Sequence, residues 1–437
     1  MKLIQLAAPG SNSGKTITTI VLSRLLNEKG YDVRGFKCGP DFIDSKFLSI
    51  ATGNARSNLD LHLMSEEGMR KAISLNYGEM GIVEGAMGYF DGIGRGTKAS
   101  AFDIAKSLDI NTILVYRPQG EMFSIIPKLK GILDYSEGRI KGIIFSMTRK
   151  MMYHQLKQMV EENLELEVLG HIEQFENLQI PNEELGLIEP VMVEEFSKNL
   201  TDAAIITEET INLDRIIELM NEVKKEELPD GQFSGFKMGI AKDMAFSFHY
   251  GENEKLLEKY FEIEYFSPLY DKKVPEVDII YIPGGKVENF KYNLSRNTSM
   301  LESIKEFHEN KGIIYGESGG LSYLSKELGG AKMCGVLNGV VHIGNRLQNF
   351  GYVNVELSQD CILGKAGTKY PAHEYHYTYY EGLEEPISRV KKASLTKEWQ
   401  CGYKLGNSYF SFQHINFCGN ENIIENIISF IKEKKCI

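Results

Sequence analysis

A glycine-rich loop near the N-terminus carries the residues with the clearest chemistry. It follows an apolar run at 3–8 and precedes apolar residues that recur at helical spacing from Ile17 onward. Loop N–H groups and the N-terminus of a helix attract phosphate oxygens, so strand, glycine loop, Gly-Lys-Thr and helix together predict nucleotide binding. The residues that we expect to hold the phosphates are Gly10, Ser11, Asn12, Ser13, Gly14, Lys15 and Thr16.

Two residues of this loop have distinct expected roles. Lys15 can reach the outer phosphates of a nucleotide, and the Thr16 hydroxyl can be a Mg²⁺ ligand. Pro9 stands where the usual spacing has its first glycine, so the motif is the shorter G-x-x-x-G-K-T. The alternative is an accidental glycine-rich turn, which the flanking strand and helix patterns disfavour.

Acidic side chains follow two further apolar runs. Asp41 and Asp44 lie in a Gly-Pro turn after the second run, and Glu84 ends the run at 80–84. Because ligands bind at the carboxyl ends of parallel strands, we expect these carboxylates beside the phosphate loop. Glu84 can hold Mg²⁺ directly or through water, and Asp91 in the next glycine-rich loop is a second acidic candidate. For the two turn aspartates, turn formation and solvation are the competing interpretation.

A second set of reactive residues lies in the C-terminal half. Ser318 stands in G-E-S-G-G, after an apolar run and before Leu321, Leu324 and Leu328 at helical spacing. Small residues around one nucleophile at a strand-to-helix turn are typical of a nucleophile elbow. His414, just before the final predicted helix, is the candidate base, and a buried structural histidine is the alternative.

The elements that must position these residues are those of an α/β protein. Buried-strand patterns recur at 112–116, 142–145 and 167–172, with helical patterns around 125–133 and 154–164 between them. We therefore expect the reactive residues to lie on loops at one edge of a parallel sheet.

Length and composition limit the domain count and the class of protein. A chain of 437 residues suits two or three domains, and the charged, then Pro/Gly-rich segment 224–236 is the best linker, so we predict domains at 1–224 and 237–437. The net charge of −11, without a basic stripe, argues against nucleic-acid binding. Six scattered cysteines, no leader and no membrane-spanning run predict a cytoplasmic protein with no membrane partner.

Several motifs resemble, in the same order, those of the cobyrinic acid a,c-diamide synthase family. They are the phosphate loop, F-K-C-G-P-D-F-I-D, A-T-G-N-A-R-S-N-L-D and E-G-A-M-G-Y-F-D-G, with A-K-D-M-A-F-S-F and Y-F-S-P-L in the second half. The resemblance implies a two-domain α/β fold. Its first domain is a P-loop parallel-sheet domain similar to dethiobiotin synthetase, and its second is a flavodoxin-like domain similar to class I glutamine amidotransferases.

The family's chemistry implies a role for each matched residue. ATP phosphorylates the a and c carboxylates of cobyrinic acid, a corrinoid, and ammonia derived from glutamine or free in solution displaces the phosphate. On this resemblance Lys15 stabilises the transferring phosphoryl group, and Asp41 and Asp91 position the substrate or ammonia. The residues implied to serve Mg²⁺ are Thr16, Asp44 and Glu84.

The sequence departs from the family pattern at two functional places. Ser318 replaces the family's nucleophilic Cys, and Asn416, not a carboxylate, stands two residues after the implied catalytic His414. A hydroxyl needs a better placed base than a thiol does. Three options follow: a site that depends on free ammonia, a substitution that disables the site or traps glutamine, and a serine nucleophile for another hydrolysis. We favour a disabled or ammonia-dependent site.

Further departures keep other readings of the whole protein open. Ser146-Met147 replace an Asn that often contacts the purine, Glu183-Glu184 replace Arg-His before L-G-L, and Leu48 replaces a His. The alternatives are a related tetrapyrrole, nickel sirohydrochlorin, as the acceptor, a non-catalytic paralogue that binds nucleotide and tetrapyrrole, and, ranked last, a serine hydrolase. Association as a homodimer also stays open.

Overall fold

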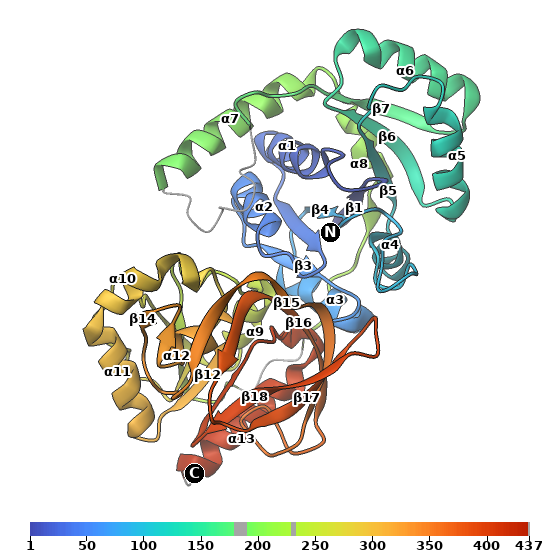
Figure 1. The fold of residues 1–437 in the computed structure, drawn as a ribbon. Coiled ribbons are helices and arrows are strands. Elements are labelled where there is room, and N and C mark those ends of the chain that lie inside the picture. Colours follow the sequence, from blue (N-terminus) through green and yellow to red (C-terminus); the bar gives the residue numbers. More distant parts are fainter. Residues whose placement is uncertain (179–189, 229–232, 436–437) are drawn as a thin grey trace. The chain divides into compact units, whose positions relative to one another are not determined.

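A computed structural model describes residues 1–178, 190–228 and 233–435 of the chain (Figure 1). Two compact units form, and each is described by itself. The first comprises Met1–Leu61 and Ser65–Leu228, and the second comprises Pro229–Ile437 together with His62–Met64. None of the helices in the described ranges is long and apolar enough to cross a membrane.

The first unit is built on a mainly parallel sheet. Its strand order is β3-β2-β4-β1-β5-β6-β7, and β8 pairs antiparallel with β1. The apolar strand runs are buried, as expected for a parallel sheet covered by helices. The strands are β1 (Lys2–Ala7), β2 (Val33–Cys38), β3 (Ser57–Leu59), β4 (Met80–Glu84), β5 (Thr112–Tyr116), β6 (Ile140–Ser146), β7 (Glu167–Ile172) and β8 (Asn221–Glu222).

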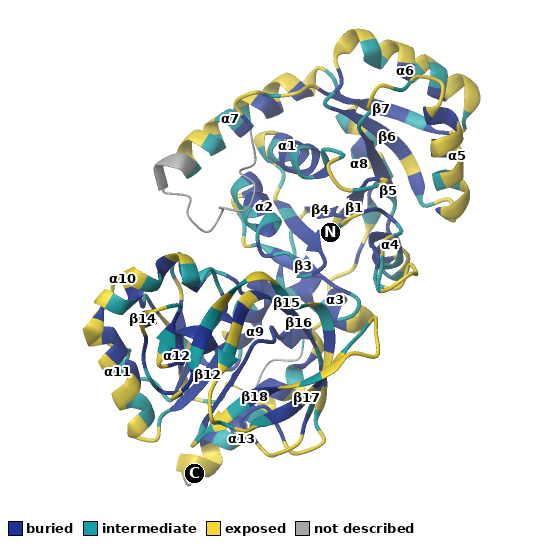
Figure 2. Cartoon of the chain, in the orientation of Figure 1, coloured by how far each residue is buried: buried dark blue, intermediate teal, exposed yellow. Residues whose placement is uncertain are grey.

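Helices follow most of these strands and bury their apolar faces. Helix α1 packs against α2 and α7, and strands and inner helix faces are buried while outer faces are exposed (Figure 2). The helices are α1 (Lys15–Glu28), α2 (Asp44–Thr52), α3 (Ser65–Leu75), α4 (Ala101–Leu108), α5 (Ile125–Tyr135), α6 (Lys150–Asn163), α7 (Pro190–Glu208) and α8 (Leu213–Leu219).

Strand register brings the predicted phosphate and metal residues to one edge. In the parallel pairs, Glu84 at the end of β4 is level with Leu6 of β1 and with Lys37 of β2. The phosphate loop starts from β1 and the Asp41 turn from β2, so both loops leave the sheet at the edge where Glu84 lies.

The second unit has a sheet that is half parallel and half antiparallel. Its order is β10-β9-β11-β12-β19-β18-β17-β15-β13-β14, and β16 pairs with β15. Neighbours among β10, β9, β11, β12 and β19 are parallel. From β19 onward, β18, β17, β15 and β16 pair antiparallel. The strands are β9 (Lys237–Ala241), β10 (Glu262–Phe266), β11 (Ile279–Ile282), β12 (Ile313–Glu317), β13 (Glu327–Leu328), β14 (Ala331–Lys332), β15 (Val340–Leu357), β16 (Lys369–Glu381), β17 (Pro386–Lys392), β18 (Glu398–Leu405) and β19 (Ser408–Ser411).

Helices follow most strands in the parallel part of this sheet. Helix α12 begins directly after β12, as the elbow pattern predicts, but it ends at Leu324. Leu328, expected in the same helix, lies instead in β13, so that part of the helix prediction is wrong. The helices are α9 (Gly251–Leu257), η2 (Val287–Phe290), α10 (Lys291–Arg296), α11 (Thr298–Glu309), α12 (Gly319–Leu324), η3 (Phe417–Gly419) and α13 (Glu421–Lys435).

Candidate active site

The phosphate loop has the backbone needed to curve around a ligand. Asn12 and Gly14 have positive φ values of 62° and 79°, and helix α1 starts at Lys15. The Ser13 hydroxyl donates to the Gly10 carbonyl at 2.9 Å and closes the loop. A glycine-containing loop in front of a helix N-terminus is the backbone that anion sites commonly use.

Lys15 is folded back onto the loop. Its ammonium donates to the carbonyls of Gly10 at 3.1 Å and Met87 at 2.5 Å. Burial, and then the nearby Lys37, lowers the pKa of Lys15 to about 8, although Glu84, Asp44 and Asp91 raise it. Nucleotide phosphates would give this ammonium stronger partners than two carbonyls.

Ser146 supports the phosphate loop from behind. Its hydroxyl donates to the Ser13 carbonyl at 2.6 Å. A Cβ on Gly14 would come within 2.5 Å of the Ser146 hydroxyl oxygen. The sequence pattern marks Ser146-Met147 only as a departure in base recognition. In the structure, Ser146 contacts the predicted phosphate loop.

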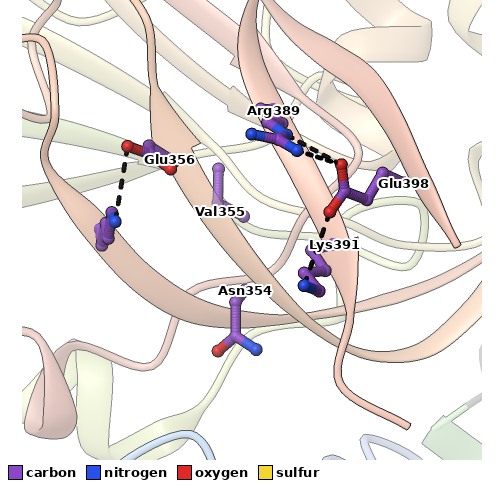
Figure 3. A pocket seen from close by; sticks show the side chains of 7 residues that line it. Asn354, Val355, Glu356, Arg389, Lys391 and Glu398 are labelled. Carbon is purple, nitrogen blue, oxygen red and sulfur yellow. Dashed lines mark hydrogen bonds and ion pairs between the residues drawn. The ribbon is translucent and has the colours of Figure 1, made fainter. Parts of the chain in front are cut away.

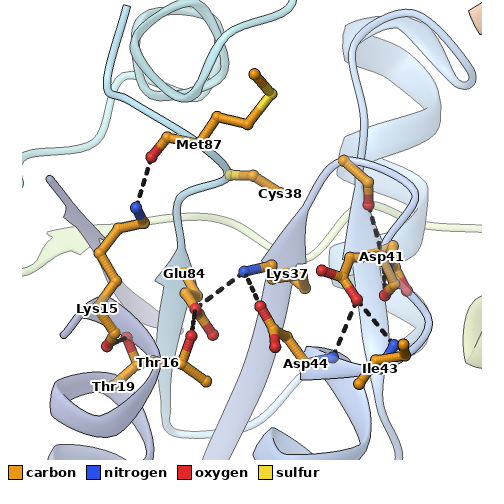
Figure 4. A network of polar contacts seen from close by, with 12 residues as sticks. Lys15, Thr16, Thr19, Lys37, Cys38, Asp41, Ile43, Asp44, Glu84 and Met87 are labelled. Carbon is orange, nitrogen blue, oxygen red and sulfur yellow. Dashed lines mark hydrogen bonds and ion pairs between the residues drawn. The ribbon is translucent and has the colours of Figure 1, made fainter. Parts of the chain in front are cut away.

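The three predicted Mg²⁺ residues lie in one network, joined by a lysine that the sequence analysis missed (Figure 4). The Thr16 hydroxyl donates to Glu84 Oε1 at 2.6 Å. Lys37 Nζ donates to the same Glu84 oxygen at 2.9 Å and to Asp44 Oδ2 at 2.7 Å. Lys37 therefore holds together two carboxylates that lie 40 residues apart in the sequence, from Asp44 to Glu84.

The network has one more negative group than Lys37 alone can neutralise. Burial alone would lower the pKa of Lys37, but the Glu84 and Asp44 carboxylates raise it above its ordinary value. Burial also raises the pKa of the Glu84 carboxyl, with Lys37 opposing and Asp44 adding to the shift. A second cation at this place would relieve the repulsion between the two carboxylates.

The residues fit a magnesium ion that a nucleotide helps to bind. Glu84 is fully buried, and its Oε2 atom has no hydrogen-bond partner in the described structure. Thr16 and Asp44 add oxygen donors, the type that Mg²⁺ prefers. Within residues 1–178, 190–228 and 233–435, no group of three or more His, Cys, Asp or Glu side chains can hold a metal alone. Phosphate oxygens and water would have to complete the coordination.

The other two predicted acids are placed by their own loops. Asp41 Oδ1 accepts from the N–H groups of Ile43 at 2.8 Å and Asp44 at 3.0 Å, and so sets the start of α2. Burial raises the pKa of Asp41. Asp91 Oδ2 accepts from the Gly88 N–H at 2.9 Å. Both carboxylates thus have turn contacts, and their roles toward a substrate stay predictions.

Leu48 is explained by packing. It is 1% exposed, belongs to the core cluster of the first unit and lies where a Cβ on Gly35 would come within 2.9 Å of it. The Glu183-Glu184 departure and the L-G-L that follows lie outside the described residues.

The second predicted site has the backbone of an elbow. Ser318 has φ 49° and ψ −106°, which is strained for a residue with a side chain, and its N–H donates to the Ser411 carbonyl at 2.7 Å. A Cβ on Gly319 would come within 3.0 Å of Gly285, and one on Gly320 within 2.1 Å of the Ile282 carbonyl oxygen. Only glycine fits at these two positions.

His414 lies against the turn formed by Gly284 and Gly285, which follows strand β11. A Cβ on Gly284 would fall 2.2 Å from His414 Cε1, so the ring packs on the turn that the elbow also contacts through Gly285. His414 is 1% exposed, and its Nδ1 lies 3.6 Å from Glu317 Oε2. The structure thus brings the two sequence-predicted residues, Ser318 and His414, to one turn, together with a glutamate that the sequence analysis passed over.

Two other polar groupings of the second unit contain none of the predicted site residues, although the His373 backbone pairs with that of His414. His373 and His376 have different surroundings: His373 contacts the rings of Phe350 and Tyr352, while His376 Nε2 lies 3.1 Å from Glu374 Oε2. A pocket on the antiparallel strands carries ion pairs among its charged side chains (Figure 3). Its lining residues are Asn354, Val355, Glu356, Lys369, Arg389, Lys391 and Glu398, none of them a predicted site residue.

Comparison with known proteins now gives the family. The model of the CobQ/CobB/MinD/ParA nucleotide binding domain matches residues 4–188, and that of the CobB/CobQ-like glutamine amidotransferase domain matches residues 237–421. The cobyrinate a,c-diamide synthase of Clostridium tetani is 36% identical over 98% of this chain and 100% of its own length. The chain belongs to the cobyrinate a,c-diamide synthase family.

Further relatives agree with this membership. The cobyrinate a,c-diamide synthases of Clostridium acetobutylicum and Methanocaldococcus jannaschii are 34% and 35% identical, over 98% and 95% of this chain and 100% and 99% of theirs. The assignment made from the sequence motifs is confirmed. So are the α/β fold with a nucleotide-binding domain before a glutamine amidotransferase-like domain, and the class of an ATP-dependent amide-forming ligase.

Proposed function

We propose that this protein uses Mg-ATP to amidate the a and c carboxylates of cobyrinic acid, with ammonia as the nitrogen donor. The observation that carries the proposal is the network of Thr16, Lys37, Asp44 and Glu84 beside the phosphate loop. One lysine and two carboxylates beside the predicted phosphate loop support a site in which Mg²⁺ and the outer phosphates of a nucleotide bind together. Family membership supports cobyrinic acid as the acceptor.

Each residue of the network has a task in phosphoryl transfer. The reaction moves the γ-phosphoryl group onto a carboxylate oxygen of the acceptor, and catalysis is mostly positioning and neutralisation of charge. Lys15 leaves its carbonyl partners for the phosphate oxygens, and Lys37 supplies a second positive charge beside them. Thr16, Asp44 and Glu84 would hold Mg²⁺, which neutralises phosphate charge when it is bound.

The second half of the reaction needs ammonia beside the acyl phosphate. Ammonia attacks the carbonyl carbon, the phosphate leaves with one oxygen of the original carboxylate, and an amide remains. Asp41 and Asp91 are our candidates for orienting the acceptor or the ammonia. We propose free ammonia as the source because Ser318 offers a hydroxyl where the family uses a thiolate.

The test is an assay with purified protein, cobyrinic acid and Mg-ATP, read by mass spectrometry. We expect the mass change of two amidations with ammonium chloride, and much slower product formation with glutamine. Equal rates with both donors would contradict ammonia dependence. Absence of product with both would contradict cobyrinic acid as the acceptor, and the same assay with nickel sirohydrochlorin would then follow.

A further inference from the structure

The histidine of the second site needs a group that orients its ring. A carboxylate two residues after the histidine could do this, but this chain has Asn416 there. The Asn416 amide is already engaged elsewhere: Nδ2 donates to Glu252 Oε1 at 2.7 Å, and Oδ1 accepts from the Cys418 N–H at 3.0 Å. Asn416 therefore starts the short helix η3, and its amide is not directed at the His414 ring.

Glu317 is a carboxylate that is buried beside the ring. It is the last residue of β12, directly before Ser318, and its side chain is 2% exposed. Strands β12 and β19 pair in parallel with Glu317 level with Ser411, three residues before His414. This register carries Glu317 Oε2 to within 3.6 Å of His414 Nδ1. The distance suits an ion pair and is longer than a hydrogen bond, as catalytic contacts often are without substrate.

Three donors fix the Glu317 carboxylate in this position. The Tyr281 hydroxyl donates to Oε2 at 2.8 Å, and Oε1 accepts from the Tyr315 hydroxyl at 2.5 Å and the Ile415 N–H at 3.2 Å. Burial, and then the Glu317 charge, raises the pKa of both tyrosines well above its ordinary value, so they stay donors. Ile415 is the neighbour of His414, and its contact ties the carboxylate to the histidine backbone.

We propose that Glu317 is the positioning residue that orients His414. It takes the role that a carboxylate at position 416 would otherwise have. An N–H on Nδ1 directed at Glu317 leaves Nε2 as the proton acceptor for a nucleophile at position 318. The Gly284 turn against the ring limits its other movements. The inference concerns the geometry of the Ser318 elbow and requires neither ATP nor a macrocycle, so it and the proposed function can each fail without the other.

The first test reads the tautomer of His414 in the full-length protein. We expect ¹⁵N chemical shifts of labelled histidines, with His414 assigned by loss of its signals in His414→Asn, to show the Nδ1–H form. In Glu317→Gln we expect that form to be lost or mixed with Nε2–H. An Nε2–H tautomer in the wild type, or an unchanged signal in Glu317→Gln, would overturn the proposal. This arm decides the matter even if no glutaminase activity is found.

The second test measures function with a matched control. In full-length protein carrying Ser318→Cys, we expect Glu317→Gln to lower kcat for glutamate release from glutamine about a hundredfold, with little change in KM. Glu252→Gln removes another buried carboxylate of the same unit, one that contacts Asn416, and should change kcat less than about twofold. A larger loss in Glu252→Gln than in Glu317→Gln would place the orienting group at Asn416 and overturn the inference.

Discussion

The two candidate sites hold their reactive groups in different ways. At the phosphate loop, Lys15 and Lys37 are bound to carbonyl and carboxylate oxygens of the protein itself, and under the proposed function Lys15 exchanges its carbonyl partners for phosphate oxygens when a nucleotide binds. At the elbow, the strained backbone of Ser318 and close glycine packing fix the geometry in advance. Under the proposed function, the first site therefore depends on exchange of charge partners, and the second is limited by the Ser318 hydroxyl that stands in place of a thiol.

The largest effect should come from removing the Lys15 ammonium of the first site. We expect Lys15→Ala to lower ATP-dependent amidation about a thousandfold or more, with ammonia or with glutamine, because the transferring phosphoryl group loses its main cation. Product formation by mass spectrometry measures this. The exposed Lys130 of α5 gives the control, Lys130→Ala, which should behave as wild type. Wild-type turnover in Lys15→Ala would remove the phosphoryl-transfer role.

The ion-pair network is the next contact to break. Lys37→Met leaves the buried Glu84 and the half-buried Asp44 without their shared cation, so we expect the free energy of unfolding to fall by about 3 kcal/mol. Adding Glu84→Gln should recover part of that loss, and Mg²⁺ should stabilise Lys37→Met more than the double variant. Urea unfolding with and without Mg²⁺ measures both effects. Equal stability of Lys37→Met and wild type would mean that the network contributes nothing to the fold.

Replacing the Ser318 hydroxyl by a thiol tests whether the second site is limited by its nucleophile. We expect Ser318→Cys to raise the ratio of glutamine-dependent to ammonia-dependent amidation about a hundredfold, because a thiolate forms near neutral pH and a hydroxyl does not ionise there. The two rates are measured with saturating Mg-ATP on the same enzyme batch. A ratio that stays at the wild-type value would show that the elbow is limited by more than its nucleophile.

The smallest expected effect is a pH dependence of nucleotide binding. The pKa of Lys15 lies at about 8 without a ligand, and phosphate contacts will raise it, so the protonated form binds more tightly. Below pH 8 the lysine is already charged and affinity is flat; above it, affinity should fall by up to about tenfold per pH unit as binding takes up a proton. Calorimetry in buffers of different ionisation enthalpy measures this uptake. Lys15→Arg should abolish the dependence, and a dependence that persists would assign it to another group.

The sequence predicts the parts of both sites that lie in local motifs. The phosphate loop, the Ser318 elbow and the α5 and α6 helices follow from spacing within short windows, and the structure has them. Lys37 and Glu317 were missed because their roles depend on partners that strand register supplies from distant segments. From the sequence, Glu317 is recognisable only as the end of a strand. The structure shows that its carboxylate lies beside the ring of His414, 97 residues later.

The lengths and pairing of the antiparallel strands in the second sheet were also not predicted from the sequence. Strands β15 and β16 are long and paired with register shifts, and their burial alternates irregularly, so no clean two-residue period marks them. Their lengths follow from pairing with each other and with β17, a non-local effect that local patterns do not contain.

Transfer of oxygen from the acceptor to phosphate tests the central claim most directly. Cobyrinic acid labelled with ¹⁸O in its carboxylates is incubated with Mg-ATP and ammonia, and the released phosphate is analysed by mass spectrometry. If a carboxylate is phosphorylated and then displaced by ammonia, each amide formed releases one phosphate that carries one ¹⁸O atom. Amide formation with unlabelled phosphate would contradict the acyl-phosphate mechanism, and with it the role assigned to the phosphate loop and its Lys37 network.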